Sequence, residues 1–586
     1  MVLESGLLQE REERYELTGP LPPLAIPTTL HDSLMARLDR LATVKGLAQL
    51  GATLGREFSY ELLQAVSPWD EATLRHGLQQ LVEAEFLYQQ GLPPQATYLF
   101  KHALIQDTAY QSLLRSTRQQ HHQRIAQVVE ARFLETVETQ PELVAHHYTE
   151  AGMSAPAIPY WQRAGQRAIQ HSANLEAIGH LTRGLEVLKT LPDTPERTQQ
   201  ELELQVALGP ALMATKGWTA PEVENVYTQA RELCRHVGET PQLFPALWGL
   251  WLFYYVRGEY QTARELGEQL LHLAERVRAP AFLLQAYHAL GPTLFYLGEL
   301  EQARQHSEQG IALYDPQQHR SHAFLYGGHD PGVCCRLFAA WALWLLGYPD
   351  QALQRRSEAL TLAQELAHPF SLAHALCMAA VLHQFRRENQ AVQEQAYAAI
   401  RLASEQGFPL WLAGATILQG WTQAEPGQSQ EGMAQMRQGL AGWQATGAEY
   451  LRLYWLALLA EAYGKSGQAD EGLRVLAEPL AAVQNTGERW WEAELYRLKG
   501  ELLLKQAVPN VQEAETCFHQ GLDIARQQQA KSLELRAAMS LSRLWQRQGK
   551  HTEADELLAP IYGWFTEGFD TADLQKAKAL LAELQR

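Results

Sequence analysis

The sequence has little of what a disulfide-bonded or metal-chelating framework needs. It contains five cysteines in 586 residues, and no two of them form a Cys-x-x-Cys pair. They are Cys234, Cys334, Cys335, Cys377 and Cys517. Such sparse cysteine excludes a disulfide framework and favours a reducing cytosol.

A secretory signal and long apolar runs are also missing. The first fifteen residues are polar after Leu8 and contain no apolar core of a signal peptide. The longest apolar stretch, Phe338 to Gly347, is about half as long as a membrane crossing requires. We therefore expect a cytoplasmic protein that has no membrane partner.

Positive charge and catalytic motifs are scarce as well. The formal net charge is -17, and a surface of this sign repels phosphate backbones, so we expect no nucleic-acid partner. The sequence has no Gly-x-x-x-x-Gly-Lys-Ser/Thr phosphate loop, no Gly-x-Ser-x-Gly elbow and no paired-carboxylate motif. We therefore predict no catalytic residue, no cofactor of this chain and no enzyme activity.

An internal repeat is the strongest feature that the sequence does contain. Turns of the form Gly-x-x-x-x-Ala separate pairs of apolar helical patterns, and the steps between successive turns are 40, 49, 40, 40, 40, 40 and 42 residues. The clear turns begin at Gly258, Gly298, Gly347, Gly467 and Gly549, and weaker ones lie at Arg387, Gly427 and near Ala507. Self-similarity at this period predicts a helical solenoid.

The residues of each turn have a physical reason. Glycine ends one helix by adopting a left-handed conformation, and the small residue five positions later lets the second helix lie close to the first. The second helix then shows helical spacing, as in Ala263, Leu266, Leu270, Leu273 and Val277. We interpret these apolar stripes as core positions.

The chain divides into four predicted segments. Residues 1–23 are expected to be the remnant of an upstream module with a proline-rich linker. Residues 24–133 contain helices and one hairpin at about Glu85 to Lys101, which is the outline of a winged helix. Residues 134–242 predict irregular helical pairs, and residues 243–586 predict repeats of about 40 residues. The fold class is therefore all-α, a helical-hairpin solenoid preceded by a small winged-helix domain with one β-hairpin.

Two stretches carry a family resemblance. The repeats resemble tetratricopeptide repeats, in the longer form found in bacterial signalling proteins. The phrases SLMARLDRL, GATLGREFSYELL, LVEAEFLY and FKHALIQDTAYQSLL, between Ser33 and Leu114, resemble the winged-helix end of a STAND-type ATPase module. Their order is similar to bacterial proteins that join a class III nucleotide cyclase, an AAA-like ATPase and repeats. It is more loosely similar to ATP-dependent transcription regulators that carry a repeat sensor.

The resemblance also implies a nucleotide contact. In related nucleotide-switch proteins a winged-helix histidine touches the phosphates, which makes His102, with Lys101, the candidate for ADP held by an ATPase domain outside this chain. The alternative is a surface lysine beside a histidine that merely starts a helix. ATP or ADP and magnesium would belong to a longer parent, and we expect the chain to be a fragment, a split-gene product or a degenerate relative.

An insert accounts for the 49-residue step. Its histidines and cysteines are His319, His322, His329, Cys334 and Cys335. Zinc sites favour Cys-x2–4-Cys, and adjacent cysteines rarely chelate one ion. We therefore predict an exposed loop between repeats that binds no metal. Asp330 and Pro331 are expected to start the next helix.

Tryptophan is frequent in the predicted first helices of the repeats. We expect most of these residues to pack between repeats and a few to line a concave surface, where exposed aromatic residues anchor partners. The eight are Trp248, Trp251, Trp341, Trp344, Trp411, Trp455, Trp490 and Trp491.

Three functions remain open. The first is a non-catalytic interaction and regulatory module that binds a protein, a peptide or a small effector in a concave groove and contacts an upstream ATPase. The second is the regulatory C-terminal half of a nucleotide cyclase or ATPase whose catalytic domains lie upstream. The third, a transcription regulator, needs a DNA-binding domain that the sequence does not reveal.

Overall fold

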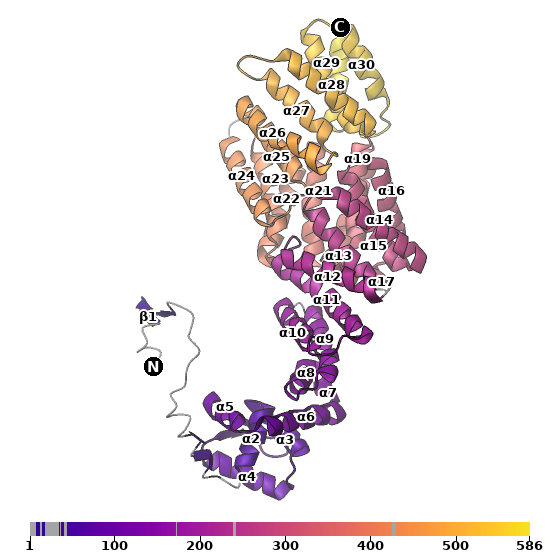
Figure 1. Cartoon of the computed structure of the whole chain (residues 1–586). Coiled ribbons are helices and arrows are strands. Elements are labelled where there is room, and N and C mark those ends of the chain that lie inside the picture. The colour runs from indigo at the N-terminus through magenta and orange to yellow at the C-terminus, as the bar shows by residue number, and fades with distance from the viewer. Residues whose placement is uncertain are drawn as a thin grey trace. The chain divides into compact units, whose positions relative to one another are not determined.

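A computed structural model of the chain describes residues 8–11, 14–17, 34–35, 37–39, 41, 44–171, 173–237, 242–424 and 429–586 (Figure 1). Two compact units are distinguished, and each is described by itself. The first takes in Met1–Ala164 and Arg183–Pro192, and the second takes in Gly165–Thr182 and Asp193–Arg586. No helix among the described residues combines the length and the apolar character that a membrane span needs.

The first unit contains the predicted hairpin. Strands β4 (Leu87–Gln90) and β5 (Thr97–Phe100) pair antiparallel, which confirms it. A third strand, β3 (Glu57–Ser59), pairs with the other edge of β5, so the strand order is β3-β5-β4. The sequence did not predict β3, because three residues are too few to show an alternating pattern. Two further strands, β1 (Leu8–Arg11) and β2 (Arg14–Leu17), pair within the segment expected to be a remnant.

Helices precede and follow these strands along the chain. The predicted helix with Leu74, Leu78 and Leu81 is α4 (Glu71–Glu83), and all three side chains are buried. The predicted helix through Leu34 and Leu38 lies partly outside the described residues. The helices of this region are α2 (Lys45–Leu54), α3 (Tyr60–Val66), α4 (Glu71–Glu83), α5 (Ala103–Gln111), α6 (Arg115–Arg132), α7 (Leu134–Thr139), α8 (Pro141–Glu150), α9 (Ser154–Gln170) and α10 (Asn174–Leu188).

The second unit contains the predicted solenoid. After α11 (Pro195–Lys216) and α12 (Pro221–Val237), its described residues form eight helix pairs and a last helix, α31 (Ala572–Leu584). The first helices of the pairs are α13 (Leu243–Val256), α15 (Pro280–Tyr296), α19 (Pro331–Leu345), α21 (Pro369–Phe385), α23 (Pro409–Gln423), α25 (Arg452–Lys465), α27 (Glu492–Leu504) and α29 (Lys531–Arg547). The second helices are α14 (Tyr260–Val277), α16 (Leu300–Leu313), α20 (Pro349–Leu366), α22 (Asn389–Gln406), α24 (Ser429–Ala445), α26 (Ala469–Thr486), α28 (Val511–Gln527) and α30 (His551–Gly563). The all-α fold class and the eight pairs are thereby confirmed.

The turns between paired helices have the predicted conformation. The five clear turn glycines have φ angles between 76° and 95°, and Arg387 adopts φ 63° at a weaker turn. The small residues that follow, such as Ala263 and Ala303, are fully buried against the first helix. The predicted turn at Gly427 lies outside the described residues.

Successive superhelical turns of the solenoid, each made of about five helix pairs, are joined by hydrogen bonds. The Glu449 amide donates a hydrogen bond to the Val256 carbonyl at 2.9 Å, and the Arg489 amide donates to the Tyr296 carbonyl at 2.8 Å. Each bond joins the end of a first helix to the segment that begins the first helix five pairs later. The third and eighth pairs are joined in the same way by the α29 residue Ser532, whose hydroxyl donates to a carbonyl near the end of α19 at 2.5 Å.

Aromatic side chains fill the space between these turns. Trp341 of the third pair stacks on Trp490 at a ring distance of 6.1 Å, and Phe385 stacks on Trp491 at 5.1 Å. All eight tryptophans singled out in the sequence are buried. The expectation that a few of them line an exposed concave surface is therefore wrong. The next turn of the solenoid covers Trp341 and Trp344, whereas side chains of the insert and of neighbouring helices pack on Trp248 and Trp411.

Candidate functional site

The sequence candidates Lys101 and His102 lie where β5 meets α5. His102 is exposed and occupies the N-cap position of α5, as its place in the sequence predicted. The Lys101 ammonium lies 3.3 Å from a Glu85 carboxylate oxygen and 4.8 Å from the centre of the Tyr88 ring. A helix start favours an anionic ligand. The role of both residues toward a nucleotide stays a prediction.

The histidine-rich insert differs from its prediction. His319, His322 and His329 are 6%, 8% and 7% exposed, so the expectation of an exposed loop is wrong. The insert forms the short helices α17 (Pro316–His319) and α18 (His322–Leu325) and then turns back into the second unit. The turn requires Gly327, whose φ is 69°, because a side chain there would lie 2.7 Å from the Trp248 ring.

The end of the insert begins α19 as predicted. The Asp330 carboxylate accepts a hydrogen bond from the Val333 amide at 3.0 Å, which caps the helix, and Pro331 occupies its first turn. The Tyr314 hydroxyl donates to the other oxygen of Asp330 at 2.8 Å. These bonds fix the direction in which the first turn of α19 presents its side chains.

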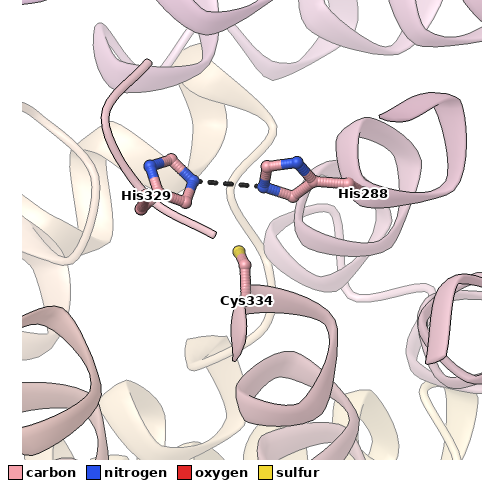
Figure 2. Close-up of side chains that lie close together, drawn as sticks. All are labelled: His288, His329 and Cys334. Atoms are coloured by element: carbon pink, nitrogen blue, oxygen red, sulfur yellow. Dashed lines mark hydrogen bonds between the residues drawn. The ribbon is translucent and has the colours of Figure 1, made fainter. Parts of the chain in front are cut away.

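Three metal-ligand side chains converge at this point. His288 lies on α15, His329 precedes α19, and Cys334 lies in the first turn of α19. Each offers one ligand atom, and these atoms all lie within 4.8 Å of one another. Figure 2 shows one nitrogen of each imidazole ring directed at the other ring and the sulfur of Cys334 pointing toward the two rings. All three residues are buried.

Hydrogen bonds fix the orientation of His288. Its Nδ1 lies 2.9 Å from the Gln285 side-chain oxygen, which can only accept, so Nδ1 carries the proton. The Nε2 atom of the neutral ring therefore presents a lone pair to His329 Nε2, 3.1 Å away. The amide nitrogen of Gln285 is held in turn by His322 Nδ1 at 2.9 Å.

A small cavity adjoins the three side chains. Its volume is about 20 Å³, which is room for one water molecule or ion. His374 of α21 also lines it, and its buried Nδ1 has no hydrogen-bond partner among the described residues. The remaining wall is mostly aromatic, with Trp218, Trp251, Tyr255, Phe338, Trp411 and Tyr450.

Burial sets the protonation of this group. It lowers the pKa of His288 and His374 well below the usual histidine value and lowers the pKa of His329 to about 4. The imidazoles are therefore neutral near pH 7, the form that binds metal ions. Burial also raises the pKa of the Cys334 thiol, so the thiol stays protonated unless a cation displaces its proton.

Sequence reasoning did not connect these residues. It singled out His329 and Cys334 but missed His288 and His374, which lie in apolar first helices of other pairs. Their types and spacing give no signal that could have identified them.

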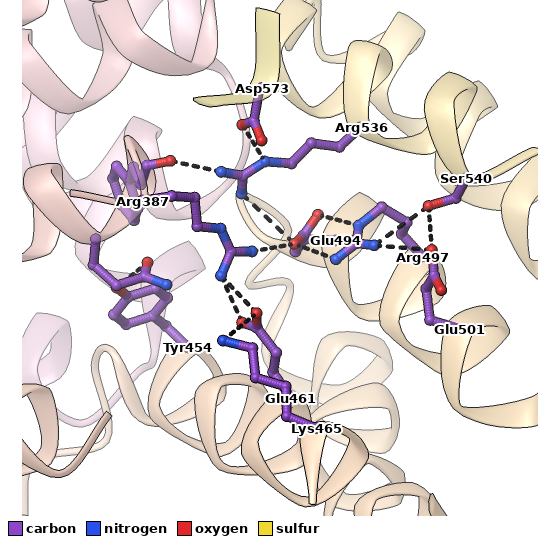
Figure 3. Close-up of polar contacts among 12 residues, drawn as sticks. Arg387, Tyr454, Glu461, Lys465, Glu494, Arg497, Glu501, Arg536, Ser540 and Asp573 are labelled. Atoms are coloured by element: carbon purple, nitrogen blue, oxygen red, sulfur yellow. Dashed lines mark hydrogen bonds and ion pairs between the residues drawn. The ribbon is translucent and has the colours of Figure 1, made fainter. Parts of the chain in front are cut away.

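A second buried polar cluster is ionic (Figure 3). Arg387 contacts both oxygens of Glu461 at 2.7 and 2.8 Å, and Arg536 contacts Asp573 at 2.7 Å. Glu494 lies between the two arginines, at 3.5 Å from Arg387 and 3.6 Å from Arg536. The cluster joins the turn after α21 to α25, α27, α29 and α31.

The arginines decide the charge of these acids. Burial alone would raise the pKa of Glu461, but the Arg387 and Lys465 charges hold that pKa below its usual value. Burial likewise opposes ionisation of Asp573, yet Arg536 and Arg387 lower its pKa. The acids of the cluster are therefore ionised at neutral pH.

One buried carboxyl has a different environment. Among the described residues Glu488 accepts from neutral donors, the Trp490 indole at 2.8 Å and the Tyr260 hydroxyl at 3.4 Å. Burial raises the pKa of Glu488 to about 8. This carboxyl is therefore largely protonated at neutral pH.

An open hollow lies on the surface beside α22 and α23. Its volume is about 640 Å³, and Tyr397 on its wall is 62% exposed. The other lining residues carry amide, hydroxyl or carboxylate groups and are Asn389, Gln390, Gln393, Glu394, Gln419 and Thr422. Such a surface offers many hydrogen-bond donors and acceptors to a partner.

Comparison with known proteins finds a longer relative. No family model matches the chain. An uncharacterized protein of Rhizobium meliloti (strain 1021) is 26% identical over 514 residues, which are 87% of this chain and 50% of that protein. The chain therefore spans about half the length of this relative.

Solved structures with a similar arrangement are distant. A STAND protein with a tetratricopeptide repeat sensor from Pyrococcus horikoshii is 11% identical, with a TM-score of 0.46 over 78% of this chain and 65% of its own. A Rap protein complexed with competence and sporulation factor is 12% identical, with a TM-score of 0.44 over 68% of this chain and 99% of its own. Similarity at this level carries no argument about function.

Proposed function

We propose that this chain is a non-catalytic interaction and regulatory sensor module of a bacterial signal-transduction ATPase. The observation that carries the proposal is the junction between the two units. The chain passes between them three times, at Ala164–Gly165 in α9, at Thr182–Arg183 in α10 and at Pro192–Asp193 before α11, and none of these points lies in a long Gly/Ser-rich segment. A junction of this kind can pass a conformational change along the chain, whereas a long Gly/Ser linker would uncouple the two parts.

The first unit would be the winged-helix end of the ATPase module. The β4–β5 hairpin, followed at once by α5, supports this assignment together with the phrases quoted above. His102 at the exposed start of α5 would then face the phosphates of ADP held by the ATPase domain, with Lys101 beside it. The relative of about twice this length leaves room for such domains in a related protein.

The solenoid would bind the signal, a protein, a peptide or a small effector. Because its first-helix tryptophans are buried, an outer surface is a better place for a large partner than the interior. The hollow beside α22 and α23 fits an extended peptide, since its amide-rich wall and exposed Tyr397 supply polar contacts and one aromatic anchor. Binding would regulate the ATPase only if it favoured one arrangement of the module.

The test of the switch uses a full-length parent that includes the ATPase domain. We expect His102→Ala to weaken ADP retention, measured by nucleotide content after gel filtration, and deletion of residues 243–586 to raise basal ATP hydrolysis. His76→Ala is the control, because His76 is an exposed histidine of the same unit. Unchanged ADP retention together with a silent deletion would leave the chain as a passive scaffold.

A nucleotide cyclase parent is the alternative. A cyclase segment and a phosphate loop in the coding sequence before Met1 would support it, and cyclic nucleotide formation by the parent would establish it. In either case the purified chain is expected neither to hydrolyse ATP nor to form cyclic nucleotides. Turnover that persists through removal of contaminants would contradict the proposal.

A further inference from the structure

We propose that His288, His329 and Cys334 bind one zinc ion inside the second unit. The ion would join the histidine-rich insert to the first helices α15 and α19. Two neutral imidazoles and one thiolate are a donor set that zinc prefers. The site would also account for the insert that lengthens one repeat to 49 residues, because the inserted residues place His329 in the interior.

The distances suit a single ion. Two nitrogens bound at about 2.0–2.1 Å to one tetrahedral zinc lie about 3.3 Å apart. The observed separation of the His288 and His329 Nε2 atoms is 3.1 Å, and the Cys334 sulfur completes a group within 4.8 Å. Small shifts of the side chains would therefore bring all three atoms to bonding distance. The proton that His329 Nε2 donates to His288 would move to His329 Nδ1, and the thiol proton of Cys334 would be released to solvent.

His288 makes the kind of hydrogen bond that commonly orients a metal-binding histidine. Histidines that bind metal ions usually donate their other ring N–H to an oxygen, which fixes the tautomer. The Gln285 oxygen accepts that bond here, and His322 of the insert holds Gln285. The lone pair of His288 Nε2 is thereby directed at the position that the ion would take.

The cavity leaves room for the fourth ligand. Its volume of about 20 Å³ holds a water molecule, and the buried Nδ1 of His374 has no hydrogen-bond partner among the described residues. A zinc-bound water or His374 itself would complete the coordination.

The site does not require two adjacent cysteines to bind one ion. Of the pair Cys334 and Cys335, only Cys334 faces the histidines. The Cys335 sulfur faces α16, where a side chain at Gly310 would meet it at 2.6 Å. The proposed site needs one cysteine and takes a histidine from another helix pair.

The competing arrangement is a hydrogen-bonded histidine pair without metal. The first unit contains such a pair, His122 and His147, whose Nδ1 atoms lie 2.8 Å apart. The Tyr110 hydroxyl occupies the other ring nitrogen of His122 at 2.9 Å, and the group has no cysteine among its ligand atoms. His122 and His147 therefore provide an internal control for the proposed site.

The experiment measures zinc in the untagged chain after gel filtration, by mass spectrometry. We expect one zinc per chain, and at least about a tenfold loss of zinc affinity in Cys334→Ser and in His288→Gln. Cys335→Ser and His122→Gln are the matched controls and should keep the ion. Circular dichroism confirms that each variant is folded.

Cobalt replacement tests the site without relying on variants. After zinc is exchanged for cobalt, the wild-type chain should show a thiolate-to-cobalt absorption band in the near ultraviolet, and Cys334→Ser should lack it. Wild-type protein that takes up far less than one zinc, cobalt protein without the thiolate band, or full zinc affinity in Cys334→Ser would each overturn the proposal.

Discussion

The two buried polar clusters of the second unit differ in whether their charges and hydrogen bonds are satisfied within the chain. In the ionic cluster the three arginines Arg387, Arg497 and Arg536 meet the three acids Glu461, Glu494 and Asp573, so cations and anions neutralise one another. In the histidine cluster, ring nitrogens and a thiol surround a small cavity. The comparison indicates that a complete cluster holds the fold, whereas an incomplete one is suited to a ligand.

Their positions support this difference. The ionic cluster joins the fourth, sixth, seventh and eighth helix pairs and α31, so its bonds cross from one turn of the solenoid to the next. The histidine cluster joins the second and third pairs through the insert. Loss of one ion pair should therefore affect the whole second unit.

The largest effect is expected from Arg536→Ala. It leaves the carboxylates of Asp573 and Glu494 buried without this partner, which should lower the free energy of unfolding by about 3–5 kcal/mol. Urea unfolding followed by circular dichroism measures the change. Arg474→Ala is the control, because Arg474 pairs with Glu471 on an exposed helix face and should contribute little. A loss below about 1 kcal/mol in Arg536→Ala would show that the cluster does not hold the turns together.

A pH-dependent effect is expected at Glu488, a buried carboxyl unlike those of the ionic cluster. Its folded pKa of about 8 lies above the ordinary value of 4.5, so the folded state retains a proton that the unfolded state releases. The resulting stability is fully present below about pH 4.5 and is lost as the pH rises through about 8. The slope is at most about 1.4 kcal/mol per pH unit.

Glu488→Gln should remove this dependence. Relative to the variant, the wild-type free energy of unfolding should fall between pH 5 and pH 8, as measured by urea unfolding at several pH values. Glu405→Gln changes an exposed carboxyl of α22 and should leave the profile of the wild type intact. Parallel profiles for wild type and Glu488→Gln would contradict the raised pKa.

The smallest effect is expected at a turn outside both clusters. Gly467 has φ 78°, and a side chain there would meet no atom within 4 Å, so its replacement is opposed by backbone strain alone. Gly467→Val should cost about 1–2 kcal/mol, and Gly467→Asn less, because asparagine tolerates the left-handed conformation better. Thermal unfolding compares the two variants, and equal melting temperatures would argue against strain.

The helix pairs could be predicted because their signals are local. A left-handed glycine such as Gly298 and a small residue such as Ala303 lie five positions apart, and the apolar spacing follows at once. The hydrogen bond from Glu449 to Val256 could not be predicted. It depends on the small rotation between neighbouring pairs, which accumulates over five of them and leaves no pattern in the sequence.

The histidine group shows the same limit. The insert was conspicuous, and Asp330 was correctly assigned to the start of α19. The burial of His329 depends on a turn at Gly327 and on space that other first helices leave between them. Its partner His288 lies in an apolar helix of the preceding pair, where a single histidine looks like an ordinary core residue.

The backbone hydrogen bonds between turns also affect how the second unit can gain or lose helix pairs and how it folds. An open repeat array can gain or lose a unit at its end, because each unit touches only its neighbours. Here loss of the eighth pair would uncover the carbonyl at the end of α19 that Ser532 caps and the aromatic rings beside it. The last pairs are therefore part of the core, and the bonds that hold them join residues 193 positions apart, as in Val256 and Glu449. Contacts of such separation form late, so we expect this solenoid to fold slowly and to unfold as one cooperative body.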